Sequence, residues 1–229
     1  MFLAILSLFL TFGASAEIEV DLELVLAVDA SGSVDDQEFG LQMTGIARAF
    51  RHPDVLAAIG EGPLGRIAVV VEVWAEARLP KDNSNWFVVH DAESAEQFAK
   101  TVEDFPRTPI GGTGIGRAIV AAVNLFDRND FFAWRRVIDI SGDGKETTTR
   151  DWSIVPELAR IQAGNRGITI NGLAILSDDP NLAAYYIENV IIGTNAFVME
   201  AATFEDFSLA IRRKLIREIN QRPQVSHHN

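Results

Sequence analysis

Three short segments of this 229-residue sequence combine acidic or hydroxyl side chains with small residues that allow tight turns. They read Asp29-Ala30-Ser31-Gly32-Ser33, Gly111-Gly112-Thr113-Gly114-Ile115-Gly116 and Ser141-Gly142-Asp143-Gly144. In the first segment a carboxylate and two hydroxyls occupy alternate positions, which points their oxygens the same way. The glycines of the second segment permit close backbone approach, and Thr113 adds a hydroxyl just before an expected helix.

The candidate ligands in these segments all bear oxygen, and they are Asp29, Ser31, Ser33, Thr113 and Asp143. A ligand set without nitrogen or sulfur suits a hard divalent cation and argues against zinc or copper. We expect Mg²⁺, with Mn²⁺ or Ca²⁺ as alternatives. Mg²⁺ takes six oxygens at about 2.0 to 2.1 Å, so water or an outside group would complete its shell.

The elements that must position these segments follow from apolar runs that alternate with amphipathic stretches, the pattern of βαβ units. We expect strands over residues 23–28, 66–74, 86–90, 137–141, 169–175 and 196–199. We expect helices over residues 35–50, 94–102, 114–126, 154–165, 182–190 and 204–221. The connection before residue 86 is too short for a crossover helix, so that strand should run antiparallel at an edge.

These elements predict an α/β fold with a doubly wound, mostly parallel six-stranded sheet, one antiparallel edge strand and helices on both faces. Ligands bind such sheets at the carboxyl ends of the strands. Two of the three segments directly follow an expected strand, and the third opens an expected helix. We therefore expect all three to meet at one edge of the sheet.

In this order, the motifs Asp-x-Ser-x-Ser, Gly-Gly-Thr-x-x-Gly and a strand-ending Asp-Gly resemble the metal-ion-dependent adhesion site of von Willebrand A domains. The resemblance spans essentially the whole chain after residue 16. It implies that Ser31 and Ser33 contact the metal directly, and Thr113 directly or through water. It also implies that Asp29 and Asp143 act mainly through waters, and that an Asp or Glu of a partner protein completes the shell.

The chain is also similar to a bacterial group of exported A-type domains that has no established function. This similarity rests on residues 137–144, on residues 189–193 and on residues 196–198. Thr194-Asn195 stands where we would expect Pro-Gly, a departure that touches no expected metal ligand.

Several polar residues near the motifs have simpler interpretations. Asp35 should cap the following helix together with Glu38, and neither Asp35 nor Asp36 is assigned to the site. Asp139 lies inside an expected central strand, so an Arg, a hydroxyl or a water must satisfy its carboxylate. The expected rim of the site, which could shape a partner surface, comprises Lys145, Glu146, Arg150, Trp152, Asp178, Asp179 and Asn181.

Composition and the first residues constrain location and partners. Residues 2–12 form an apolar run followed by Ala14-Ser15-Ala16, which predicts a signal peptide over residues 1–16 and a periplasmic or secreted protein. We expect one domain over residues 17–222, no membrane span after cleavage, and a disordered tail over residues 223–229. The absence of cysteine rules out disulfides and thiolate metal sites. A net charge of −12 argues against nucleic acid as a partner.

The function that we predict is a non-enzymatic binding module that uses its cation to bind a carboxylate of a protein or peptide. Two alternatives stay open. One is a Mg²⁺-dependent phosphoryl-transfer or hydrolytic enzyme, because many such enzymes place an Asp after the first strand of this architecture. The other is a structural cation that only holds the three loops together.

Overall fold

The computed structural model describes residues 17–108, 110–148 and 153–221. Its centre is a twisted sheet, and the parallel strands, in their order across it, are β3 (Ile67–Trp74), β2 (Glu23–Asp29), β7 (Arg136–Gly142), β8 (Ile168–Ile175) and β9 (Val198–Ala201). Two short segments, β4 (Asp82–Asn83) and β5 (Phe87–Val89), pair antiparallel with β3 at one edge. The predicted fold class is confirmed: β5 is the predicted antiparallel edge strand, and β4 is a short seventh strand that was not predicted.

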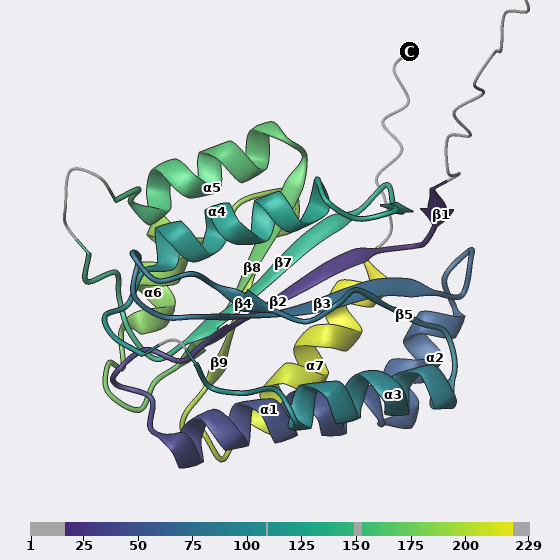
Figure 1. The fold of residues 1–229 in the computed structure, drawn as a ribbon, viewed down its shortest axis with the longest axis horizontal. Helices are drawn as coiled ribbons and strands as arrows, with labels where there is room; N and C mark the ends of the chain where they lie inside the picture. The colour runs from purple at the N-terminus through teal and green to yellow at the C-terminus, as the bar shows by residue number, and fades with distance from the viewer. Residues whose placement is uncertain (1–16, 109, 149–152, 222–229) are drawn as a thin grey trace, which may run out of the picture.

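Helices cover both faces of the sheet (Figure 1). On one face lie α1 (Asp36–Phe50), α2 (Pro53–Gly60), α3 (Ala92–Glu103) and α7 (Phe207–Asn220). On the other face lie α4 (Ile115–Phe126), α5 (Pro156–Asn165) and α6 (Leu182–Asn189). Each layer of helices encloses its own apolar cluster against the sheet. The central strands β2 and β3 are buried along their whole length, as their continuous apolar runs predict.

Local sequence signals account for several helix boundaries. Asp35 and Glu38 form the predicted capping box at the start of α1, where each side chain accepts a hydrogen bond from the other residue's backbone N–H. Helix α1 ends at Phe50, as predicted. Pro53 opens a separate helix, α2, that was not among the predicted elements, since proline needs no N–H partner in a first turn.

Two further features of the fold were not predicted. Strands β1 (Ile18–Glu19) and β6 (Phe131–Phe132) form a small parallel pair beside the main sheet. Asn195 adopts a positive φ of 61°, a conformation that glycine tolerates best and asparagine better than most other residues. Asn at the position where we would expect Gly is therefore compatible with the positive φ of this turn.

The order of strands places a topological switch point at the centre of the sheet. The chain passes from β2 outward to β3 and later returns to β7 on the other side of β2. Loops therefore diverge above the adjacent ends of β2 and β7, which is where doubly wound proteins bind ligands. No helix among the described residues is both long and apolar enough to cross a membrane.

Candidate metal centre

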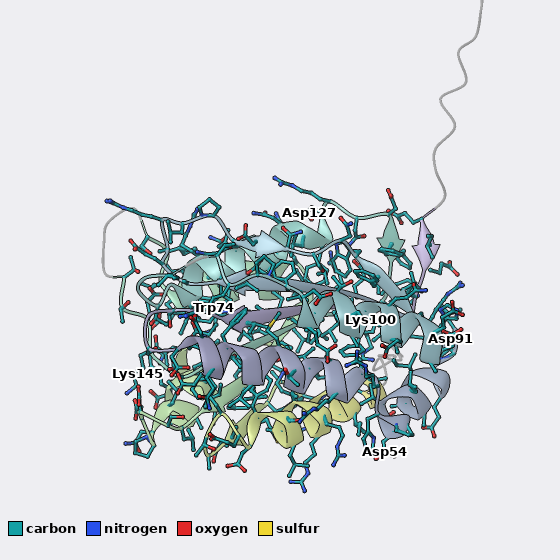
Figure 2. All side chains as sticks on the ribbon, turned by 60° about the horizontal axis from the view of Figure 1, so that its bottom comes forward. Asp54, Trp74, Asp91, Lys100, Asp127 and Lys145 are labelled. Atoms are coloured by element: carbon teal, nitrogen blue, oxygen red, sulfur yellow. The ribbon has the colours of Figure 1, made fainter. Side chains whose placement is uncertain are left out.

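The first and third motifs meet at this switch point. Asp29 is the last residue of β2, and Asp143 directly follows β7, its neighbour in the sheet. In Figure 2, Trp74 at the end of β3 and Lys145 in the loop after β7 lie toward the same end of the molecule, whereas Asp54 and Asp91 lie toward the opposite end. The carboxyl ends of the strands thus converge as predicted.

Hydrogen bonds join the first motif to the third. The Asp29 Oδ1 atom accepts a bond of 2.7 Å from the Ser31 backbone N–H, which turns the loop back over the strand end. The Ser31 and Ser33 hydroxyl oxygens lie 3.3 Å apart. The Ser33 hydroxyl donates a bond of 2.8 Å to Asp143 Oδ1, across 110 residues of sequence. Asp29, Ser31, Ser33 and Asp143 therefore form one contiguous cluster of oxygens.

The second motif packs against the same cluster. The Gly32 N–H donates to the Gly111 carbonyl at 2.7 Å, which links the two loops through their backbones. Gly111 has a φ of 146°, a conformation that side-chain-bearing residues rarely adopt. Thr113 is almost fully buried, and its Oγ1 atom lies 3.7 Å from the position that a Cβ atom of Gly144 would take. Thr113 thus lies next to the third motif.

Arg107 holds the first loop from the side. Its guanidinium donates to the carbonyls of Ala30 and Ser31 at 3.4 and 3.2 Å and also to that of Val34. Its other arm forms an ion pair of 2.5 Å with Asp36. One planar cation therefore binds three carbonyls of a single turn, which limits the conformations available to Ser31 and Ser33.

Gln42 of α1 contacts the ends of both strands that carry the two carboxylates. Its side-chain amide donates to the Asp29 carbonyl at 3.0 Å, and its Oε1 atom lies 3.5 Å from the Ser141 hydroxyl. Gln42 is fully buried, so these bonds join α1 to the ends of β2 and β7 in a site without bulk water.

The negative charges of Asp29 and Asp143 are poorly stabilised in this buried site. Burial raises the pKa of Asp29 to about 7, and the negative charge of Asp143 adds to that rise. Burial also raises the pKa of Asp143, an effect that the hydrogen bond from Ser33 partly offsets. Asp29 Oδ2 is buried and has no hydrogen-bond partner among the described residues. A buried, unpaired carboxylate oxygen of this kind is costly unless a cation or a donor satisfies it.

These residues fit a hard divalent cation. The cluster offers two carboxylates and three hydroxyls, with one carboxylate oxygen unsatisfied. The described part of the chain contains no group of three or more His, Asp or Glu side chains suited to a metal.

The predicted rim is only partly described. Lys145 and Asp179 form an ion pair of 2.7 Å, and the negative charge of Asp178 contributes to the raised pKa of Asp143. Glu146 instead faces inward, where its carboxylate accepts from the Gly116 and Thr148 N–H groups at 3.0 and 2.9 Å. Arg150 and Trp152 lie outside the described residues, as do the predicted signal segment 1–16 and the tail 223–229.

A second buried charge cluster lies away from this centre, under α7. Asp139 Oδ1 lies 2.7 Å from the Lys214 ammonium, which also binds Glu218 Oε1 at 2.7 Å. Asn171 donates to the same Glu218 oxygen at 2.8 Å. The expected partner of Asp139 was an arginine, a hydroxyl or a water, so the identity of the partner is corrected here to a lysine.

The sequence contained weak signals for the supporting residues that we did not predict. Gln42 is a polar residue between Phe39 and Met43 on the apolar face of its helix, which indicates a buried hydrogen bond. Lys214 and Glu218 are spaced i,i+4 in the last predicted helix and are sequence neighbours of the apolar residues Leu215 and Ile219. Arg107 has no such signal, because its contacts depend on how two distant loops pack.

Residues 19–223 match the family model described as "Protein of unknown function (DUF1194)". No curated protein matches the sequence. The structure is similar to proximal thread matrix protein 1 from the mussel byssus (TM-score 0.62, 14% identity, 90% of this chain and 50% of that one). It is also similar to the pilus adhesin SpaC from Lactobacillus rhamnosus GG (TM-score 0.63, 14% identity, covering 87% of this chain and 30% of that one).

A third similar structure is the vWF domain of the type V pili tip protein Mfa5 from Porphyromonas gingivalis (TM-score 0.58, 14% identity, covering 90% of this chain and 98% of that one). This chain therefore spans about half the length of the mussel protein and less than a third of SpaC. One structure of the mussel protein has zinc in its metal-ion-dependent adhesion site (MIDAS) motif (TM-score 0.60, 14% identity, covering 90% of this chain and 50% of that one). These similarities show a von Willebrand A fold.

Proposed function

We propose that this chain, which belongs to the DUF1194 family and has the von Willebrand A fold, is a binding module that grips an acidic group of a protein partner through one divalent cation. We assign the cation to Asp29, Ser31, Ser33, Thr113 and Asp143, and expect it to be Mg²⁺. The proposal includes export to the periplasm or beyond, in keeping with the pilus and adhesin proteins that share the fold.

The observation that carries this proposal is the unpaired Oδ2 atom of buried Asp29 beside the Ser31, Ser33 and Asp143 oxygens. Burial raises the pKa of both Asp29 and Asp143, and a dication beside them would stabilise their ionised forms. Because Asp29 and Asp143 are expected to act mainly through waters, the direct protein ligands would be neutral hydroxyls, and the cation would accept one more anion from outside. Ser33, which is exposed, lies on the side of the cluster that a partner could reach.

A metal titration tests the first half of the proposal. Isothermal titration calorimetry with Mg²⁺, Mn²⁺, Ca²⁺ and Zn²⁺ compares the wild type with Ser31→Ala. Zinc is included because it occupies the corresponding motif of the mussel protein. We expect Ser31→Ala to weaken Mg²⁺ binding by more than about tenfold, because direct ligands matter at least as much as their outer partners. Ser94→Ala is the matched control, since Ser94 caps α3 away from the site.

A capture experiment tests the second half. Immobilised wild type and Ser31→Ala are exposed to cell-envelope extract in Mg²⁺ or in EDTA. We expect a partner that is retained only by the wild type and only in Mg²⁺, and that acetate displaces while the isosteric acetamide does not. Identical retention in Mg²⁺ and EDTA would contradict the proposal.

The same preparations address the alternatives. Hydrolysis of phosphate esters by the wild type, lost in Asp29→Ala, would indicate an enzyme instead. Metal binding that raises the melting temperature, but leaves partner capture unchanged, would indicate a structural cation.

A further inference from the structure

A second buried oxygen without a partner lies beside Asp29. The hydroxyl of Tyr186, in α6, is fully buried and forms no hydrogen bond to any described residue. A phenol hydroxyl carries a proton at neutral pH and can donate it to an acceptor. Buried tyrosines normally direct this hydroxyl at a partner, so an unpaired one calls for an explanation.

Gly142 brings the two unpaired oxygens to the same place. A Cβ atom built on Gly142 would lie 2.7 Å from Asp29 Oδ2 and 2.8 Å from the Tyr186 hydroxyl oxygen. Both oxygens therefore border the small space above the last residue of β7, which is empty only because this residue is a glycine. One oxygen is an acceptor without a donor, and the other is a donor without an acceptor.

We propose that Tyr186 is a positioning residue of the metal centre: its hydroxyl and Asp29 Oδ2, which form no hydrogen bond in this structure, come within bonding distance when the cation binds, and the bond that Tyr186 then donates holds that carboxylate toward the cation. This inference rests on the proposed function. The Ser31 N–H already holds Oδ1, so a bond from Tyr186 to Oδ2 restrains the remaining rotation of the carboxylate. Each carboxylate oxygen has a further lone pair, which stays available to the metal or its waters.

A purely structural role would require only the ring of Tyr186. The ring packs in the apolar cluster between the sheet and α4, α5 and α6, a place that phenylalanine would fill equally well. The hydroxyl is the part that packing does not explain, because burying it unpaired lowers stability. Gly142 has the same explanation, since any side chain there would displace one of the two oxygens.

Tyr186→Phe removes only this hydroxyl. We expect it to weaken Mg²⁺ binding about 10- to 100-fold by calorimetry, the range typical of groups that orient metal ligands, while the metal-free protein stays folded by circular dichroism. Tyr185→Phe is the matched control, because the Tyr185 hydroxyl contacts the Glu146 N–H at 3.3 Å and no assigned ligand. It should bind Mg²⁺ with wild-type affinity.

Gly142→Ala provides a second readout. The added methyl group should keep the two oxygens from approaching each other and so weaken Mg²⁺ binding, and a further Tyr186→Phe change should then have little effect. Wild-type Mg²⁺ affinity in Tyr186→Phe would overturn the inference and leave the proposed function standing. Failure of the wild type itself to bind a divalent cation would overturn the proposed function and, with it, this inference.

Discussion

Among single residues, Lys214 occupies an unusual environment. It is fully buried and binds two carboxylates, those of Asp139 and Glu218, at 2.7 Å each. One positive charge thus faces two acidic groups. Burial raises the pKa of Asp139 to about 7, and the negative charge of Glu218 adds to the rise. A second oxygen on each carboxylate is buried without a partner among the described residues. This cluster joins α7 to β7 through the core.

Replacing Lys214 should therefore be costly. Lys214→Met leaves two uncompensated buried carboxylates, and we expect the free energy of unfolding to fall by about 3–5 kcal/mol in urea titrations. Because the folded pKa of Asp139 lies above its unfolded value, ionisation costs stability as pH rises. The fall in the free energy of unfolding from wild type to Lys214→Met should therefore be larger at pH 8 than at pH 5. Arg213→Met, on the exposed face of α7, should change stability by less than about 0.5 kcal/mol. Equal stability of the two variants would contradict this account.

At the scale of elements, the loop after β2 is held by a residue from a distant segment. Arg107 binds three carbonyls of residues 30–34 and pairs with Asp36 in the first turn of α1. The loop that carries Ser31 and Ser33 is thereby ordered before any ligand arrives. Such pre-organisation lowers the conformational cost of binding.

The conservative substitution Arg107→Lys tests this arrangement. Lysine retains the charge that pairs with Asp36 but cannot reproduce the planar fork that reaches several carbonyls at once. We expect Mg²⁺ affinity to fall about tenfold and the Val34 amide, which bonds to the Ser31 carbonyl, to exchange its hydrogen faster. Arg48→Lys, on the exposed side of α1, is the control. Unchanged exchange at Val34 would show that the loop is ordered without Arg107.

Across the whole molecule, the metal site and the fold are linked through protons. The folded pKa of Asp29 is about 7, against 3.8 for an unperturbed carboxyl group. Metal-free protein should therefore lose stability as pH rises from about 4 to 7, while this buried group ionises. A divalent cation binds the ionised form and should return that stability.

We accordingly expect Mg²⁺ to raise the melting temperature more at pH 8 than at pH 5. Calorimetric scans in excess Mg²⁺ and in EDTA at both pH values measure the difference, which follows from preferential binding to the folded state. In Asp29→Asn the Mg²⁺ effect should be small at both pH values. An equal shift at pH 5 and pH 8 in the wild type would show that Asp29 ionisation is not coupled to the metal.

The periodicity of the sequence predicted most of the architecture, because the buried strands and amphipathic helices follow local patterns of apolar residues. Strand β2 and helix α1 lie within two residues of their predicted bounds. The second helix at Pro53 was missed because a proline that ends one helix and a proline that opens another look alike in sequence. The β1–β6 pair was missed because two-residue strands carry no periodicity.

By itself, the sequence determined the order of the elements and the candidate ligands, since both depend on residue types at short, local spacings. Only the tertiary structure decided which groups satisfy those ligands. Gln42, Arg107 and Tyr186 reach the site from three different segments, and their contacts depend on the packing of helices and loops far apart in the chain. Side-chain chemistry can be read from the sequence, but such long-range contacts exist only once the chain has folded.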